Sequence, residues 1–164
     1  MAREESSVLT VDELEARLAE CRRQGKKIVF TNGCFDILHP GHVTYLEAAR
    51  GLGDTLVVGL NSDLSVQRLK GEKRPIMPQS ARARLLTALE AVSFVVIFDE
   101  ETPYDLIARL KPDILVKGGD WKPETIVGRD LVEARGGKVC ALPFVGDYST
   151  SAIIEEIIRR YDRQ

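Results

Sequence analysis

The sequence lacks the features that mark membrane-spanning, disulfide-bonded and nucleic-acid-binding proteins. Its 164 residues carry a formal net charge of -2, so there is no excess of basic residues to form a nucleic-acid-binding face. No apolar run approaches the roughly 20 residues needed to cross a bilayer, and the acidic N-terminus has no signal-peptide core. The 3 cysteines have neither disulfide-framework nor zinc-site spacing. We therefore expect a cytoplasmic protein with neither a nucleic-acid nor a membrane partner.

Short apolar runs rich in β-formers alternate with helical patterns along the chain. Strands are expected at 28–31, 55–60, 94–98, 114–116 and 138–142. Helices are expected at 10–25, 41–51, 80–91, 103–110, 124–135 and 149–161. This alternation predicts a single-domain, Rossmann-like α/β fold, an open parallel five-stranded sheet with helices on both faces. Residues 1–26 would form an N-terminal helical segment, and residues 27–164 the domain that follows it.

The stretch after the first predicted strand has the composition of a phosphate site. His39 and His42 lie three residues apart at a predicted helix start, so both can face one ligand. Pro40 suits the first helical position, where free amides and the helix dipole favour an anion. Gly33 and Gly41 have no Cβ, so the backbone can approach a phosphate closely. Two ordinary surface histidines are the alternative, which this combination disfavours.

Three further groups add to this candidate site. Asp36 is a candidate Mg²⁺ ligand, because hard cations prefer carboxylate oxygens. Ser149 and Thr150 precede the last predicted helix, where hydroxyls either bind phosphate oxygens or simply cap the helix. Polar clusters follow the predicted strands at 32–42, 61–63, 99–100, 117–122 and 144–151. Because ligands of open parallel sheets bind beyond the carboxyl ends of the strands, we expect the clusters to share one active edge.

Residues 33–42 read G-C-F-D-x-x-H-x-G-H and resemble the HxGH motif of the cytidylyltransferase-like nucleotidyltransferases. Further stretches at 61–71, 74–75 and 116–124 are similar to one branch, the D-glycero-D-manno-heptose 1-phosphate adenylyltransferases of bacterial ADP-heptose synthesis. The resemblance covers about residues 27–160. It implies that residues 27–164 form a nucleotidyltransferase domain. It also suggests the stand-alone form of the enzyme, without the sugar kinase that is fused to it in many bacteria.

The motifs and the resemblance together give a set of candidate site residues. The candidate catalytic residues are His39, His42 and Lys70. The candidate nucleotide-binding residues are Asn32, Gly33, Cys34, Phe35, Gly41, Lys117, Gly119, Asp120, Ser149 and Thr150. The candidate substrate-binding residues are Asp36, Asn61, Arg68, Arg74 and Trp121, with Lys73 and Arg82 as weaker candidates. A solvated charged loop at Lys70 and simple packing of Trp121 are the alternatives.

The resemblance implies transfer of AMP from ATP to the heptose 1-phosphate, with Mg²⁺ as cofactor. The product would be an ADP-heptose used for lipopolysaccharide. The attacking phosphate is already anionic near pH 7, because its second pKa is about 6, so no general base is required. A homodimer or higher homo-oligomer is expected, as are a separate heptose kinase and phosphatase upstream.

Two other functions stay open at this stage. One is a cytidylyltransferase for glycerol- or ethanolamine-phosphate, which usually carries an arginine where this chain has Phe144. The other is a non-catalytic nucleotide-binding domain, which the joint presence of both histidines and the late hydroxyls disfavours. A dinucleotide-binding dehydrogenase is disfavoured because no Gly-x-Gly-x-x-Gly follows the first predicted strand.

Overall fold

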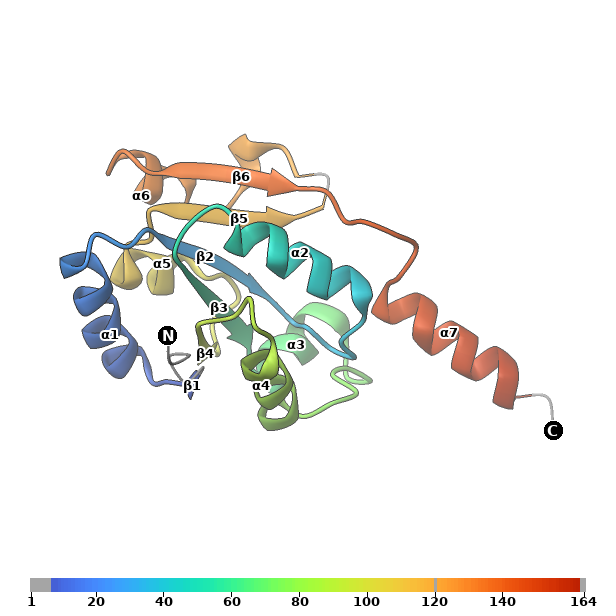
Figure 1. Cartoon of the computed structure of the whole chain (residues 1–164). Helices are drawn as coiled ribbons and strands as arrows, with labels where there is room; N and C mark the ends of the chain where they lie inside the picture. Colours follow the sequence, from blue (N-terminus) through green and yellow to red (C-terminus); the bar gives the residue numbers. More distant parts are fainter. Residues whose placement is uncertain (1–6, 120, 163–164) are drawn as a thin grey trace.

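A parallel β-sheet runs through the centre of the computed structural model, which describes residues 7–119 and 121–162 (Figure 1). Its strands are β1 (Ser7–Val8), β2 (Ile28–Gly33), β3 (Thr55–Asn61), β4 (Phe94–Phe98), β5 (Ile114–Gly118) and β6 (Lys138–Leu142). The spatial order is β1-β4-β3-β2-β5-β6, and all neighbours are parallel. The predicted open parallel sheet is therefore confirmed. Within the described residues, β1 adds a short edge strand to the five expected.

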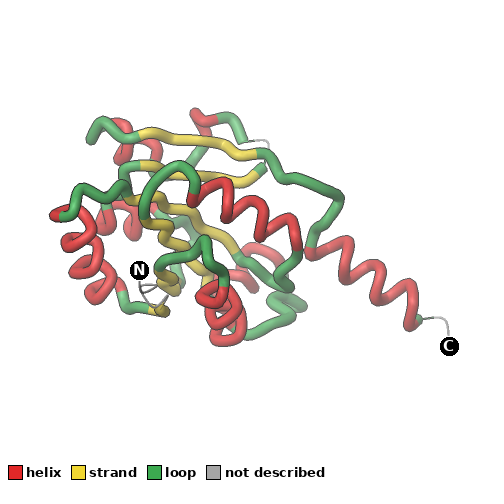
Figure 2. Tube along the Cα trace, viewed as in Figure 1, coloured by secondary structure: helices red, strands yellow, loops and turns green. Residues whose placement is uncertain are grey.

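Helices connect the strands on both sides of the sheet (Figure 2). They are α1 (Val11–Arg23), α2 (Pro40–Arg50), α3 (Asp63–Lys70), α4 (Gln79–Ala88), α5 (Tyr104–Leu110), α6 (Arg129–Glu133) and α7 (Thr150–Tyr161), with a 3₁₀ turn, η1 (Pro123–Thr125). Helix α3 was not expected. Ser62 begins it by accepting a hydrogen bond from the backbone of Ser65 at 3.1 Å.

The expected helix at 124–135 is broken into η1 and α6. Gly128 lies between them with a φ of 87°, in the left-handed region. A right-handed helix cannot continue through a residue in this conformation, so α6 begins separately after Gly128. A Cβ at this position would lie 2.6 Å from Cδ1 of Ile107, so helix α5 leaves no room for a side chain there. The helical periodicity of the segment was present in the sequence, but it did not show the break.

Two apolar layers hold the helices on the sheet. Successive strand residues point to opposite faces, so Ile28 and Phe30 pack with α1, α5 and α6, whereas Val29 packs with α2 and α4. The N-terminal segment belongs to the first layer, because α1 buries Leu14 and Leu18 there and β1 pairs with β4. The predicted start of α1 is confirmed. Its cap is a capping box in which Thr10 and Glu13 bond reciprocally.

The strand order creates a topological switch point at the centre of the sheet. From β2 the chain proceeds to β3 and β4 on one side, and β5 and β6 lie on the other. The connections after β2 and β5 therefore diverge, which opens a crevice at their carboxyl ends. Helix α7 begins beside that crevice and then projects away from the body of the protein (Figure 1).

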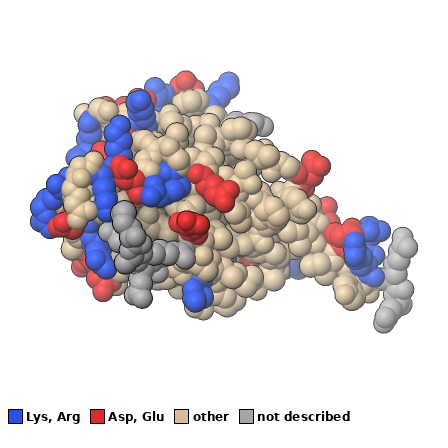
Figure 3. Space-filling model, viewed as in Figure 1, with Lys and Arg blue, Asp and Glu red and all other residues tan. Residues whose placement is uncertain are grey.

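The surface carries charges of both signs. Lys and Arg side chains lie among Asp and Glu side chains on the face drawn in Figure 3, with no uniform basic face in this view. Within the described ranges, no helix combines the length and apolar character needed to cross a membrane.

Two glycine substitutions test how closely Ile107 of α5 packs against Gly128, the residue before α6. Gly128 and Gly136 both have positive φ, but nothing lies within 4 Å of a Cβ placed on Gly136. We expect Gly136→Ala to lower the free energy of unfolding by about 1 kcal/mol and Gly128→Ala by about 3 kcal/mol. Urea denaturation measures both values, and equal losses would contradict the close contact with Ile107.

Candidate active site

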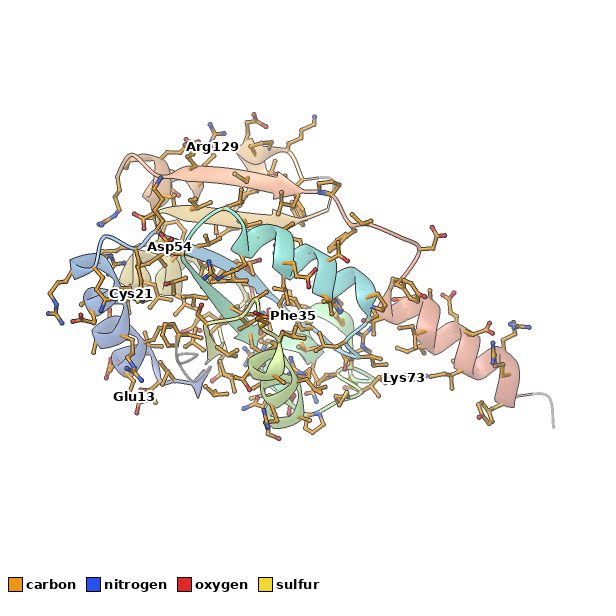
Figure 4. The ribbon with its side chains drawn as sticks, in the orientation of Figure 1. Glu13, Cys21, Phe35, Asp54, Lys73 and Arg129 are labelled. Carbon is orange, nitrogen blue, oxygen red and sulfur yellow. The ribbon has the colours of Figure 1, made fainter. Side chains whose placement is uncertain are left out.

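A cavity of about 630 Å³ opens at the switch point, between the carboxyl ends of β2 and β5. The sequence-predicted residues that line it are Asn32, Gly33, Cys34, Phe35, Asp36, His39, His42, Asn61, Lys70, Arg74, Lys117, Trp121, Ser149 and Thr150. In Figure 4, Phe35 marks this end of β2, whereas Cys21 and Asp54 lie toward the opposite end of the sheet. The structure therefore brings together residues from widely separated parts of the chain.

The two histidines form a stacked pair at the start of α2. His39 is the extended residue that precedes the helix, Pro40 is its first residue, and His42 follows within the first turn. The two imidazole centroids are 3.8 Å apart and the rings are inclined by 22°. Both Nδ1 atoms are buried, and neither finds a hydrogen-bond partner among the described residues. Such atoms are normally paired, so their presence in a cleft indicates that a ligand supplies the partner.

Burial keeps this pair uncharged in the free protein. It lowers the pKa of His42 to about 4, and the neighbouring His39 lowers it further. Burial also lowers the pKa of His39. At neutral pH both rings are therefore neutral. A bound anion would raise both pKa values, because a nearby negative charge favours the protonated imidazole.

Two lysines bring positive charge to the same cleft. Lys70 is the last residue of α3, and Lys117 lies near the carboxyl end of β5. Burial, and secondarily the charge of Lys70, lower the pKa of Lys117, whose Nζ lies 5.6 Å from the centre of the Trp121 ring. Neither lysine forms an ion pair with a carboxylate of the described residues. The carboxylates of the described lining are those of Asp36, which pairs with Arg74, and Glu101, so neither lysine has a carboxylate partner among these residues.

Cys34 lies between these cations but is not activated by them. Burial raises the pKa of its thiol, against the opposing influence of Lys70 and other nearby cations. The thiol therefore stays protonated at neutral pH. Since the thiolate is the nucleophilic form of cysteine, this agrees with the absence of any nucleophilic role for Cys34 in the predicted site.

The structure gives Asp36 a different role from the one expected. Its carboxylate is buried and accepts hydrogen bonds from Nε of Arg74 at 2.7 Å and from the backbone of Ile76 and Met77 at 2.8 and 3.0 Å. Burial opposes its ionisation, but these donors outweigh that effect and lower its pKa. Both oxygens are thus occupied, and Asp36 anchors the loop at 71–77 instead of facing a ligand.

This arrangement does not fit a magnesium site held by the protein. Asp36 was the expected ligand, and its oxygens already accept hydrogen bonds from the chain itself. Elsewhere in the described ranges, no three His, Cys, Asp or Glu side chains are grouped so that they could hold a metal ion. The described residues of the cleft therefore do not form a carboxylate site for a divalent cation.

Arg82 also has a structural role, where a substrate contact was a weaker expectation. Its side chain is fully buried and donates to the carbonyl oxygens of Cys34 at 2.6 Å, Asn61 at 2.9 Å and Met77 at 3.0 Å. It also donates to Oδ1 of Asp63, at 2.8 Å. One guanidinium thus joins the ends of β2 and β3 to the loop anchored by Asp36.

The hydroxyls before α7 serve the fold as well as the cleft. Ser149 caps the helix by accepting a hydrogen bond from the backbone of Ala152 at 3.0 Å. Thr150 donates its hydroxyl to the backbone carbonyl of Asp36. The predicted capping role of Ser149 is therefore confirmed. Both residues also line the cleft, so a phosphate role stays a prediction.

Among the expected residues that the structure describes, the lining does not include Gly41, Arg68, Lys73, Arg82 and Gly119. Arg68 donates to the backbone carbonyl of Asp99 at 3.1 Å. Gly41 lies against the His39 side chain, and a Cβ on Gly41 would be 3.1 Å from the imidazole ring. Gly119 adjoins the lining but is not part of it. Asp120 lies outside the described residues.

An aromatic wall of the cleft was missed by the sequence reasoning. The rings of Tyr45 and Phe144 lie 5.8 Å apart, and a Cβ on Gly118 would lie 2.8 Å from the Phe144 ring. The Tyr45 hydroxyl pairs with Thr31 at 2.6 Å, and burial raises its pKa to about 12. Tyr148 stacks on His39 with centroids 6.2 Å apart. The position of Tyr45, one helical turn after His42, was the available signal.

These features define a class of protein. A doubly wound parallel sheet carries, at its switch point, a helix start with two histidines, two lysines and an aromatic wall. That is the layout of a nucleotidyltransferase domain, which must hold a base and several phosphate groups side by side. The cytidylyltransferase-like family model matches residues 30–156, and the chain belongs to that family.

Comparison with curated proteins gives close relatives. The chain is 57% identical over 157 residues to the bifunctional protein HldE of Citrifermentans bemidjiense, covering 96% of this chain and 32% of that protein. It is 52% identical over 160 residues to the bifunctional protein HldE of Geobacter metallireducens, covering 98% of this chain and 33% of that protein. The chain thus spans about a third of the length of these relatives.

Solved structures share the fold. The lipopolysaccharide core biosynthesis protein of Thermoplasma volcanium superposes with a TM-score of 0.59 at 30% identity, covering 76% of this chain and 100% of that one. The pantothenate synthetase of Thermus thermophilus superposes with a TM-score of 0.61 at 17% identity, covering 90% of this chain and 67% of that one. The second likeness concerns the fold alone.

The lowered pKa of His42 predicts a loss of stability in acid. An unfolded histidine titrates near pH 6.5, so between pH 6.5 and about 4 the unfolded chain binds more protons at this residue than the folded one. Its contribution to stability is therefore present above pH 6.5 and is lost as the pH falls toward 4. We expect the loss to reach about 2 kcal/mol, because His42 is only partly buried.

Urea unfolding at a series of pH values measures this effect, with His42→Gln as the matched variant. The variant should lose less stability than the parent protein between pH 6.5 and 4, since the contribution of His42 is then absent and that of the other groups, including His39, is unchanged. Parallel stability curves for the two proteins would contradict the burial of an uncharged His42.

Arg82→Met tests the buried guanidinium that joins the strand ends. It would leave three backbone carbonyls without their donor, and we expect the free energy of unfolding to fall by about 3–5 kcal/mol. The exposed Arg84 on the same helix is the control, and Arg84→Met should change stability by less than about 0.5 kcal/mol. Similar losses in both variants, measured by urea unfolding, would contradict the role given to Arg82.

Proposed function

We propose that the chain transfers AMP from ATP to D-glycero-D-manno-heptose 1-phosphate, giving ADP-heptose and pyrophosphate. The observation that carries this proposal is the stacked pair His39 and His42, whose Nδ1 atoms have no hydrogen-bond partner among the described residues and which share the cleft with Lys70 and Lys117. Such a cleft suits a ligand with several phosphate groups. The similarity of residues 116–124 to the heptose branch supports the choice of sugar.

The proposed reaction needs positioning more than proton transfer. An oxygen of the sugar phosphate attacks the α-phosphorus of ATP, and the bond to the departing pyrophosphate breaks. The attacking group is largely a dianion at pH 7, so no side chain has to remove a proton. Catalysis then depends on holding two anions together and on balancing charge in the transition state.

The residues of the cleft divide this work between them. The histidine pair and the start of α2 would hold the triphosphate, where an imidazole N–H donates to a phosphate oxygen. Lys70 and Lys117 approach from α3 and β5 and would balance the charge of the phosphates. The ring of Phe144, which is 55% exposed and is supported by the buried Tyr45, would offer an apolar face for the base.

The cofactor and the cellular setting are parts of the same proposal. We expect a requirement for Mg²⁺, but as an ion bound to the phosphates of ATP, because the described residues do not fit a protein-held site. We expect the reaction to take place in the cytoplasm. A kinase and a phosphatase acting earlier would supply the sugar 1-phosphate.

Pyrophosphate release tests the proposal directly. Purified protein with Mg²⁺ is given ATP or CTP, each with the heptose 1-phosphate or with glycerol 3-phosphate. The proposal predicts release with ATP and the heptose substrate alone. Release with CTP and glycerol 3-phosphate would reassign the chain to the cytidylyltransferases. Nucleotide binding without release in any mixture would favour a non-catalytic domain.

His42→Ala tests the contribution of the histidine pair. We expect kcat to fall about 10²–10³-fold, as for the loss of one donor to a transition-state anion. Lys73→Ala is the control, since Lys73 is exposed on the neighbouring loop and does not line the cleft (Figure 4). Its kcat should stay within about twofold of the parent value. A folded His42→Ala protein with a near-normal rate would contradict the proposed role.

A further inference from the structure

The candidate cleft extends over both faces of the sheet, and the residues assigned to ATP lie mainly on one of them. That face is covered by α2, and Tyr45 packs in its apolar layer. The other end of the cleft lies on the face covered by α5, because Leu115 and Ile126 line it and pack in the α5 layer. We call it the α5 end, and its lining includes Glu101, Thr102, Pro103, Trp121 and Val127. An acceptor must lie beside ATP, so the chemistry of this end bears on which acceptor binds.

The α5 end combines exposed apolar side chains with one carboxylate. Leu69, Trp121 and Val127 line the cleft and are 50%, 47% and 41% exposed. Glu101 is also exposed, and its carboxylate forms no hydrogen bond or ion pair with the described residues. Ligand pockets typically join an apolar lining to a few polar groups that orient the ligand. A sugar suits this lining, because its carbon face packs on apolar surface while its hydroxyls donate to a carboxylate.

Hydrogen bonds hold the loop that carries Glu101. The buried Ser65 donates its hydroxyl to the carbonyl oxygen of Glu100 at 3.1 Å. Arg68 donates to the carbonyl oxygen of Asp99, also at 3.1 Å. Helix α5 begins three residues after Glu101 and fixes the other side of the loop. A side chain presented from a fixed loop binds a ligand with a smaller loss of conformational freedom.

A second wall of the α5 end is joined to the same helix. Tyr104, the first residue of α5, donates its hydroxyl to Oδ2 of Asp130 in α6 at 2.7 Å. Helix α5 also packs against Gly128, which follows the segment at 121–127. Within that segment, the Trp121 ring has its centre 5.6 Å from Nζ of Lys117. A sugar that packs on Trp121 would therefore have its phosphate group close to a cation.

We propose that Glu101 accepts hydrogen bonds from the hydroxyls of the acceptor sugar that lie farthest from its phosphate group. The inference rests on the proposed function, which supplies a sugar phosphate as acceptor. Charge sets the orientation, because the phosphate is attracted by Lys70 and Lys117 and repelled by a carboxylate. The site would thus select acceptors with a long, uncharged and hydroxyl-rich end, and would disfavour those with a second anionic group there.

Glu101→Gln tests this role in steady-state assays of pyrophosphate release. We expect KM for the heptose 1-phosphate to rise about 10-fold, because hydrogen bonds to a charged acceptor are stronger than those to an amide. KM for ATP should stay within about twofold of the parent value. An unchanged KM for the sugar phosphate would overturn the inference, and so would a rise in KM for ATP alone.

Glu100→Gln is the matched control. It removes the same charge from the same loop, but Glu100 does not line the cleft, and its carboxylate accepts a hydrogen bond from the backbone of Asp99. Both KM values should stay within about twofold of those of the parent. Both glutamates are exposed, so neither substitution should unfold the protein. Equal increases in KM for the sugar phosphate in the two variants would overturn a specific role for Glu101.

A shorter acceptor tests which end of the sugar meets Glu101. The hexose 1-phosphate that lacks the seventh carbon of the heptose also lacks its last hydroxyl. The parent should prefer the heptose 1-phosphate about 100-fold in kcat/KM, since a site built to bind a hydroxyl rejects an analogue without it. The preference should fall to about 10-fold in Glu101→Gln and stay near the parent value in Glu100→Gln. The same preference in all three proteins would overturn the inference.

Calorimetric binding separates this inference from the proposed function. The heptose 1-phosphate is titrated into protein that holds an ATP analogue with a methylene group between its α- and β-phosphates. Its Kd should rise about 10-fold in Glu101→Gln alone. A parent protein that neither binds the sugar phosphate nor releases pyrophosphate with it would overturn the proposed function and this inference together. A parent that does both, with equal affinity in Glu101→Gln, would overturn this inference alone.

Discussion

The cleft depends on buried charged hydrogen bonds that fix the chain where β2 and β3 end. Arg82 joins the carbonyl oxygens at these two strand ends to that of Met77. Asp36 then ties the same loop from the other side, through Arg74 and two backbone donors. Loops are normally the mobile parts of an α/β domain, so these bonds turn the walls of the cleft into fixed structure.

The buried charged side chains that hold the loops are paired with one another, whereas four other side chains of the cleft are not. His39, His42, Lys70 and Lys117 line one cleft, and none of them pairs with a carboxylate of the part of the chain that the structure describes. Burial holds the histidines neutral, which avoids the cost of two adjacent positive charges while the cleft holds no ligand. An arriving polyphosphate would supply both the hydrogen-bond acceptors and the counter-charge. This division between paired and unpaired groups connects the fold to nucleotidyl transfer.

Local patterns predicted the elements, whereas long-range contacts decided the roles. The alternation of strand and helix and the start of α2 follow from periodicity, Pro40 and nearby glycines. The partners of Asp36 lie 38 to 41 residues further along the chain, so no local pattern revealed that its carboxylate is occupied. Arg82 was a weaker candidate for substrate binding, because no local pattern showed that its side chain would be buried, and the charge-rich composition around Lys70 concealed α3. The pKa of His42 depends on burial that only the folded chain creates.

The most direct measurement is an NMR titration of the imidazole groups, with and without ATP. The sequence contains only 2 histidines, His39 and His42, so the signals report on the pair alone. Without nucleotide, His42 should titrate near pH 4 and His39 below its usual value, and ATP should raise both pKa values. Two histidines that titrate near pH 6.5 and do not respond to ATP would contradict a neutral, buried pair that receives the phosphates.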